Sequence, residues 1–289
     1  MAASSLSAHG GTGLADRYLV GRVLHQGESS VVLEGWDRET DEKVEIKYVE
    51  GHSVSFKDSK EELMVKLHHP NLLNYIARYE EDDGIYYVRE HADGGNLKEL
   101  FSAHQAYTPC VSEEEIKYLA YQICLGLQYA HSQGVIHCDV KPENILLMKN
   151  GQVKITGFCL LKDELKDPDS RLKASQIGTL GYKALETFHS RFPEEMEFAI
   201  KADSYGAGAT ILFMLLGEEN FYKPSGSLYD AVWQRILSRG IASLGMDFVA
   251  ELLARNPLDR LSVHQMIYHP WLFDLPVSRP EPKPFVTRG

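Results

Sequence analysis

The hydrophobic pattern of this chain changes its period once, near residues 90–95, and this change limits the folds it can adopt. Before it, apolar and polar residues alternate in short runs broken by turn signals such as EDDG (81–84), as in antiparallel strands. After it, apolar residues recur every three to four positions, as on one face of a helix. The expected strands cover 18–24, 30–36, 44–50, 71–80 and 84–90 with one helix over 59–69, and the later helices cover 114–132, 201–217 and 246–255. The sequence therefore predicts an α+β fold with a small β-rich N-lobe and a larger, mainly helical C-lobe.

The same pattern sets the expected boundaries. The N-lobe covers 17–90, a hinge covers 90–95 and the C-lobe covers 96–275. Residues 1–16 are small and polar, as expected of a flexible tail. The segment from residue 276 to 289 contains SRPEPKPF and is expected to be extended. Within the C-lobe, Ser112 followed by Glu115 is a capping box that predicts the start of a helix.

Composition argues against several classes of partner. The 289 residues carry a formal net charge of -11, with a sequence pI of about 5.6, which disfavours binding to nucleic acid or to an acidic membrane surface. The longest apolar run, residues 209–216, is too short to span a bilayer, and the N-terminus lacks the apolar segment of a secretory signal. The four cysteines form no CxxC pair, which fits a reducing compartment. We expect the protein in the cytoplasm, with the nucleus as the alternative.

Seven motifs in a fixed order relate the chain to a known family. The strongest is HCDVKPENILL (137–147), which is similar to the kinase catalytic loop H-R-D-x-K-x-x-x-N. The others are VEIK (44–47), HHPNLL (68–73), GTLGYKALE (178–186), KADSYGAG (201–208), NPLDR (256–260) and HPWLF (269–273). In this order they resemble the eukaryotic protein kinase superfamily over about residues 18–273. Lys141 and Thr179 are typical of its serine/threonine branch.

The resemblance assigns roles to residues of the catalytic loop. Asp139 matches the aspartate that accepts or orients the substrate hydroxyl proton. Lys141 matches the lysine that reaches the transferring phosphate, and Asn144 matches a magnesium ligand. Among structural anchors, Asp203 matches the aspartate that holds the catalytic-loop backbone. The ion pair that ties the activation segment to the C-lobe matches Glu186 and Arg260.

The resemblance also implies a site for ATP. Lys47 matches the strand lysine that pairs with the α- and β-phosphates. The full set of implied nucleotide contacts is Leu24, Gly27, Val32, Lys47, Glu90, Ala92 and Leu146. Magnesium would have Asn144 as its one remaining ligand of the family's pair, since the second position holds a glycine. The resemblance therefore gives ATP as a possible ligand and magnesium as a possible but doubtful one.

Several departures from the family pattern gather on the nucleotide side. Gly157-Phe158-Cys159 stands where the family has Asp-Phe-Gly, so the carboxylate that bridges the metal to the phosphates is missing. In the glycine loop, His25 and Ser30 replace the outer two glycines and hinder close approach of backbone amides to phosphate. Cys138 replaces the arginine of the catalytic loop and removes the cation that would order a phosphate at Ser175.

Two further departures concern the adenine position. Glu45 replaces the alanine that packs on adenine, and Arg89 occupies the gatekeeper position just before Glu90. One hypothesis is that Glu45 and Arg89 form a salt bridge that fills this position. The alternative is that Arg89 turns toward the helix and meets Glu61 or Glu62. The usual place of the helix glutamate that pairs with Lys47 falls on Lys60, so this pairing is also in question.

Two functions follow from the balance of preserved and lost residues. The first is a pseudokinase, a catalytically impaired scaffold or allosteric regulator that binds other signalling proteins. The second is an active but atypical serine/threonine kinase that transfers the γ-phosphate of ATP to a protein hydroxyl. The first explains the simultaneous changes at Glu45 and Gly157, and the second explains the retention of Lys47, Asp139 and Lys141. Nucleotide bound as a purely structural ligand lies between them.

Overall fold

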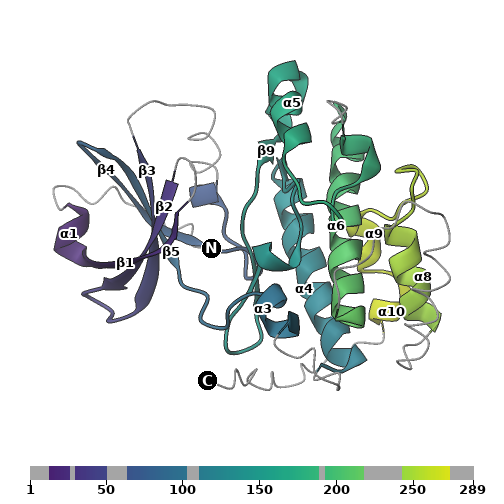
Figure 1. Cartoon of the computed structure of the whole chain (residues 1–289), viewed down its shortest axis with the longest axis horizontal. Coiled ribbons are helices and arrows are strands. Elements are labelled where there is room, and N and C mark those ends of the chain that lie inside the picture. Colours follow the sequence, from purple (N-terminus) through teal and green to yellow (C-terminus); the bar gives the residue numbers. More distant parts are fainter. Residues whose placement is uncertain are drawn as a thin grey trace, which may run out of the picture. The chain divides into compact units, whose positions relative to one another are not determined.

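The chain forms two compact units, Met1–Ala92 and Asp93–Gly289. The computed structural model describes residues 13–26, 30–50, 64–102, 111–188, 193–217 and 243–273. In Figure 1 the first unit is built on a sheet, drawn in purple and blue, and the second consists mainly of helices. The α+β fold class predicted from the change of period is confirmed.

The first unit contains a five-stranded antiparallel sheet. Its strands are β1 (Tyr18–Gln26), β2 (Ser30–Asp37), β3 (Lys43–Glu50), β4 (Tyr75–Glu81) and β5 (Gly84–Glu90), in the spatial order β1-β2-β3-β5-β4. A short helix, α1 (Leu14–Arg17), precedes β1. The predicted strands at 18–24, 30–36, 44–50 and 84–90 all form within this sheet.

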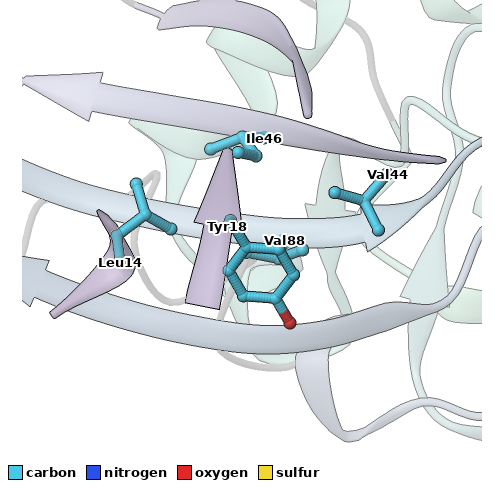
Figure 2. Packing of buried hydrophobic residues seen from close by; sticks show 5 residues of the cluster. All are labelled: Leu14, Tyr18, Val44, Ile46 and Val88. Atoms are coloured by element: carbon cyan, nitrogen blue, oxygen red, sulfur yellow. The ribbon is translucent and has the colours of Figure 1, made fainter. Parts of the chain in front are cut away.

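One face of the sheet carries a small core. Figure 2 shows its members, Leu14, Tyr18, Val44, Ile46 and Val88, all of which are buried. Burying an aliphatic side chain of this size stabilises a fold by about 1.5–3 kcal/mol. Because side chains alternate along a strand, Val44 and Ile46 on this face place Glu45 and Lys47 on the opposite face of β3.

The second unit is built around two long helices, α4 (Glu113–Ser132) and α6 (Met196–Leu216). The α6 helix is buried over most of its length and ends at Gly217, whose φ of 69° closes the helix in the left-handed conformation. In the described part of this unit, the further helices are α3 (Leu97–Ser102), α5 (Pro168–Gln176), α8 (Ser243–Leu252), α9 (Val263–Met266) and α10 (Pro270–Phe273), with 3₁₀ turns η1 (Pro142–Asn144), η2 (Lys162–Lys166) and η3 (Leu185–Thr187).

Two short antiparallel strand pairs hold the segments from which the candidate site is built. One pairs β6 (Val135–Ile136) with β9 (Leu160–Leu161), and the other pairs β7 (Ile145–Leu147) with β8 (Val153–Ile155). The capping box predicted at Ser112 is confirmed, because its hydroxyl accepts a hydrogen bond from the Glu115 amide at 3.2 Å and Glu115 Oε2 accepts one from the Ser112 amide at 2.7 Å.

Several element boundaries differ from the sequence predictions, among them α8, which covers Ser243–Leu252 rather than 246–255. The β4 strand begins at Tyr75 rather than residue 71, since Leu72 and Leu73 are buried in the turn that precedes it. The α6 helix begins at Met196 rather than residue 201, because the fully buried Ala199 extends its apolar surface by a turn. The N-terminal tail was predicted to run to residue 16, but Leu14 begins α1, and its amide donates to Glu81 Oε1 at 2.8 Å.

Some predictions fall on residues outside the described ranges. These are the glycine-loop residue Gly27, most of the helix expected over 59–69, including Lys60, Glu61 and Glu62, and the segment 276–289. Within the described ranges, no helix combines the length and the apolar character needed to cross a bilayer.

Candidate active site

The catalytic-loop residues of the second unit lie between β6 and β7. Asp139 is the centre of the group: Lys141 Nζ lies 2.8 Å from its Oδ2, and Thr179 Oγ1 donates a hydrogen bond to its Oδ1 at 3.1 Å. Lys141 Nζ also donates to Thr179 Oγ1 at 2.7 Å, which closes a triangle of three side chains. The structure thus brings Asp139 and Lys141 together, and adds Thr179 as the residue that joins them.

Asn144 fixes the backbone of the same loop. Its Nδ2 donates to the carbonyl oxygen of Asp139 at 2.8 Å and lies 3.4 Å from Asp139 Oδ2. The Asn144 carbonyl in turn accepts from the Thr156 amide at 3.1 Å. Because the amide group is anchored through its nitrogen, its oxygen is the atom left to serve as a ligand.

Asp203 of α6 binds the backbone at the start of the catalytic loop. Its two carboxylate oxygens accept hydrogen bonds from the amides of His137 and Cys138, both at 2.8 Å, and Oδ2 lies 2.7 Å from His131 Nε2. Burial opposes ionisation of Asp203, but the hydrogen bond and charge of His131 and the hydrogen bond from the His137 amide together hold its pKa below the ordinary value. This clamp lets Cys138 adopt its unusual φ of 67°, which a side chain other than glycine rarely takes.

His137 acts in this structure as a neutral spacer. Its Nδ1 accepts from the Asp139 amide at 3.2 Å, and its Nε2 faces the Thr156 carbonyl oxygen at 2.8 Å. These partners require one protonated and one unprotonated nitrogen. Burial lowers the pKa of His137 more than the Asp203 and Asp139 carboxylates raise it, which also favours the neutral ring. The ring packs against Phe158 at a centroid distance of 4.7 Å.

Gly157, where the family has its metal-binding aspartate, lies directly beside Asn144. Its φ is 88°, in the region that favours glycine, and a Cβ placed on it would lie 3.2 Å from Asn144 Cγ and 3.3 Å from Asn144 Oδ1. A side chain at this position would therefore point at the Asn144 amide, as a second metal ligand must. The glycine leaves that space without a carboxylate.

The described residues do not fit a magnesium ion well. Magnesium is normally held by one or two carboxylates together with phosphate and water oxygens. Asn144 is neutral, and the Asp139 carboxylate, 3.4 Å from the Asn144 amide nitrogen, is already engaged by Lys141 and Thr179. Within the described ranges, no group of three or more His, Cys, Asp or Glu side chains is placed to hold a metal ion.

In the first unit, Glu45 is the centre of an ion cluster on the sheet face opposite the core. Glu45 and Arg89 are direct cross-strand neighbours on β3 and β5. Arg89 contacts Glu45 Oε2 through Nε at 2.9 Å and through a terminal nitrogen at 2.8 Å, and His91 Nδ1 faces Oε1 at 3.2 Å. The predicted Glu45–Arg89 pair is confirmed. The alternative partners of Arg89, Glu61 and Glu62, lie outside the described residues.

The environment of Glu45 favours its charged form. Its residue is 9% exposed, and burial by itself disfavours the carboxylate. The hydrogen bond with His91 and the charge and hydrogen bonds of Arg89 outweigh burial, so the pKa of Glu45 lies below its ordinary value. The cross-strand neighbour of Glu45 on β2 is Glu34, whose carboxylate lies 2.5 Å from Lys43 Nζ. The part of this sheet face around Glu45 therefore carries paired charges.

The other residues predicted to contact nucleotide are divided between the two units. In the first unit, Val32 lies directly across from Lys47, Leu24 is 39% exposed on β1, and Ala92 is buried just beyond β5. Glu90 ends β5 and accepts a hydrogen bond from the Asn74 amide at 2.7 Å through Oε1. In the second unit, Leu146 lies on β7 opposite Lys154.

The activation segment carries a helix that the sequence did not lead us to expect. Asp167 caps α5, and its Oδ2 accepts from the Ser170 amide at 2.9 Å. Ser175, in the last turn, is buried, and its hydroxyl donates to the Leu172 carbonyl at 2.7 Å. Beyond α5, the predicted pair of Glu186 and Arg260 is present at 2.5 Å, with Arg260 2% exposed.

His91 is the residue of the site that the sequence prediction missed. It lies two positions after Arg89, so the alternation of side chains along a strand places the two side chains on the same face of the sheet. That signal was available, but His91 lies one residue past the end of β5, where alternation no longer had to hold.

Comparisons with known proteins agree with this arrangement. Residues 18–272 match the protein kinase domain, so the chain belongs to the protein kinase family. A probable myosin light chain kinase of Dictyostelium discoideum is 30% identical, over 90% of this chain and 67% of its own length. The serine/threonine-protein kinase RAD53 of Saccharomyces cerevisiae is 28% identical, over 93% of this chain but 35% of its own length.

Solved structures give the same result. The crystal structure of Rad53 residues 1–466 in complex with AMP-PNP superposes with a TM-score of 0.70 at 25% identity, covering 91% of this chain and 67% of that one. The chain is thus a protein kinase domain whose relatives are serine/threonine kinases.

Proposed function

We propose that this kinase domain is catalytically impaired and acts by binding other signalling proteins, as a scaffold or allosteric regulator of phosphorylation. The observation that carries the proposal is the Glu45 ion cluster. By resemblance, position 45 packs against adenine, and Lys47 on the same strand face meets the phosphates. A nucleotide base on this face would have to cover a carboxylate that is already paired with Arg89 and His91. Covering or breaking such a pair is unfavourable.

The changes around Gly157 add to this effect. Catalysis of phosphoryl transfer consists almost entirely of positioning and charge stabilisation. Loss of one positioned contact to a transition state can lower a rate by about 10²–10³. Since the adenine position and the metal carboxylate change together, we expect turnover far below that of a typical protein kinase.

The second candidate is an active, atypical serine/threonine kinase that uses ATP. The specific observation that favours it is the complete triangle of Asp139, Lys141 and Thr179, with Asn144 bonded to the loop backbone. In addition, the relative Rad53 was crystallised in complex with AMP-PNP. Under this candidate, the Glu45 cluster would have to open when nucleotide binds.

Thermal unfolding with ATP, with and without magnesium, tests the proposal. A ligand at about 100 times its Kd stabilises a fold by about 2.7 kcal/mol, which gives a readily measured shift in Tm. We expect no shift in either condition. A magnesium-dependent shift together with transfer of labelled phosphate to a generic protein substrate would contradict the proposal and support the active kinase.

Two triple variants separate the effect of the change at the adenine position from the effect of the missing metal carboxylate. Glu45→Ala with Arg89→Met opens the adenine position, and adding Gly157→Asp supplies a carboxylate beside Asn144. The matched control carries Gly157→Ala, which has the same backbone strain at φ 88° but no carboxylate. We expect ATP binding in both triple variants and magnesium dependence in the aspartate variant alone.

The proposal that the chain acts by binding other signalling proteins is tested in cells. Asp139→Asn and Lys47→Met each remove a side chain that catalysis requires. Each changes only one residue and leaves the rest of the surface available to a binding partner. If the chain acts by binding, each variant restores the phenotype of cells from which the chain has been deleted. Failure of both variants, with normal protein levels, would favour the kinase.

A further inference from the structure

A groove in the second unit, whose lining contains none of the candidate site residues, has the properties of a peptide-binding surface. It has a volume of about 590 Å³ and is lined by residues of α8, by Leu261 and Gln265 before and within α9, by the residues that follow α9 and by the start of α10. Its apolar wall includes Leu244, which is 40% exposed, Tyr268, which is 73% exposed, and Pro270. A tyrosine exposed to this degree in the wall of a groove is available to a ligand.

The charge of the groove is negative. Asp247 and Glu251 lie one turn apart on α8 and both line the groove, and the lining within the described ranges contains no lysine or arginine. The one further titratable lining group besides Tyr268 is His269, whose Nδ1 accepts from the Trp271 amide at 3.1 Å and whose Nε2 lies 4.0 Å from Glu251 Oε2. The ring of His269 also packs on Phe248 at 4.9 Å, so this wall is firmly held.

An aromatic and proline wall beside two carboxylates suits one class of peptide. Proline-rich segments in the polyproline II conformation bind aromatic-lined grooves with little loss of entropy, because their backbone is already extended. Cationic residues in such a segment would meet Asp247 and Glu251. The chemistry of the groove therefore favours a basic, proline-rich strand.

The chain contains such a segment immediately after the groove. Residues 276–285 read PVSRPEPKPF, with four prolines and with Arg279 and Lys283 against the single acidic Glu281. The described structure ends at Phe273 in α10, the helix whose first residue lines the groove. At about 3.1 Å per residue, ten residues in polyproline II span about 31 Å, enough to cross the groove.

We propose that residues 276–285 of this chain bind in the α8–α10 groove, with prolines against Tyr268 and with Arg279 and Lys283 near Asp247 and Glu251. A segment tethered by a short linker reaches an effective concentration of about 1 mM, so even a weak site is largely occupied. This inference does not depend on whether the domain is catalytically active.

Photo-crosslinking of the full-length chain tests the proposal. Phe285→p-benzoylphenylalanine places a photoreactive ring in the segment, and mass spectrometry identifies the crosslinked peptide. We expect crosslinks within the same molecule to peptides containing Leu244 or Tyr268. Crosslinks to other regions, or none, would overturn the proposal. A dimeric product that increases with protein concentration would assign the groove to a second copy and also overturn it.

Charge variants test the recognition itself. We expect Asp247→Lys with Glu251→Lys to reduce the crosslink about fivefold, since two ion pairs are replaced by repulsion. Combining these with Arg279→Glu and Lys283→Glu should restore it. The matched control, Glu42→Lys with Asp163→Lys, reverses two exposed carboxylates elsewhere and should leave the crosslink unchanged.

The aromatic wall is tested separately. Tyr268→Ala should reduce the crosslink and Tyr268→Phe should retain it, because stacking needs the ring but not the hydroxyl. Since Tyr268 is 73% exposed, neither change should alter the Tm of the protein. An unchanged crosslink in Tyr268→Ala, with an unchanged Tm, would contradict the assignment of the prolines to this wall.

Discussion

Among single residues, Glu45 is the one on which the proposed loss of nucleotide binding rests. The carboxylate uses both oxygens, one for Arg89 and one for His91, so it is satisfied without any ligand. A polar group that is already fully paired gives up its bonds reluctantly, because a partner left buried and unpaired is unfavourable. We therefore expect Glu45 to keep its bonds to Arg89 and His91 when a ligand is offered.

We expect Glu45→Ala to lower the free energy of unfolding by about 1–3 kcal/mol. This lies below the value for a fully buried pair, because the Arg89 and His91 side chains retain 13% and 20% exposure. Urea denaturation measures the change. The double variant Glu45→Ala with Arg89→Met should recover much of the loss, since no unpaired charge remains. A double variant that is less stable than the single one would contradict this account.

The same pair predicts a pH dependence. The pKa of Glu45 is lower in the folded than in the unfolded chain, where it is about 4.5, so its contribution is complete above that value and decreases as pH falls through the folded pKa. Glu45→Gln cannot titrate. The stability difference between the wild type and Glu45→Gln should therefore be largest near pH 7 and shrink below pH 4.5. Urea titrations at several pH values measure it, and a constant difference would contradict the prediction.

At this scale the sequence was a good guide where geometry is local. The kinase resemblance placed Glu45 and Arg89 at the same position and so suggested their pairing, and the structure shows them as cross-strand neighbours on β3 and β5. The second partner, His91, was missed because it follows the end of the strand. The φ of 88° at Gly157 also could not be read from the sequence, since glycine adopts many conformations.

Among secondary-structure elements, α4 shows how a helix start is specified. Ser112 and Glu115 each satisfy the other's backbone amide, which leaves fewer unpaired groups in the first turn. We expect Ser112→Ala to lower the free energy of unfolding by about 1 kcal/mol and Ser112→Asp to be nearly neutral. Chemical denaturation measures both. Ser132→Ala, at the other end of α4, is the control and should change stability less than Ser112→Ala does.

Elements with strong periodicity were predicted best. The strands and α4 combine a clear pattern with a turn or capping signal, and the structure confirms them. The α5 helix was missed because it has few apolar residues, and Leu172 remains 41% exposed. Its start does carry a local signal, Asp167 followed by Pro168, which favours the first turn of a helix.

For the whole molecule, net charge gives a prediction that does not depend on the site. The formal charge of -11 and the sequence pI of about 5.6 mean that mutual repulsion between molecules vanishes as the pH approaches 5.6. We expect the solubility of the full chain to fall several-fold between pH 7.5 and pH 5.6. Light scattering and the protein remaining after centrifugation measure it. Equal solubility at both values would contradict the prediction.

The position of Asp203 has a consequence for how activity is inferred in this family. Because this carboxylate, on the central helix α6, holds the amides of His137 and Cys138, the shape of the catalytic loop is part of the folding of the second unit. A chain that no longer needs chemistry must still keep this loop to remain folded. The backbone shape of the catalytic loop therefore reports selection for a stable domain, and selection for turnover is read instead from the side chains that would meet nucleotide and metal, such as those at positions 45 and 157.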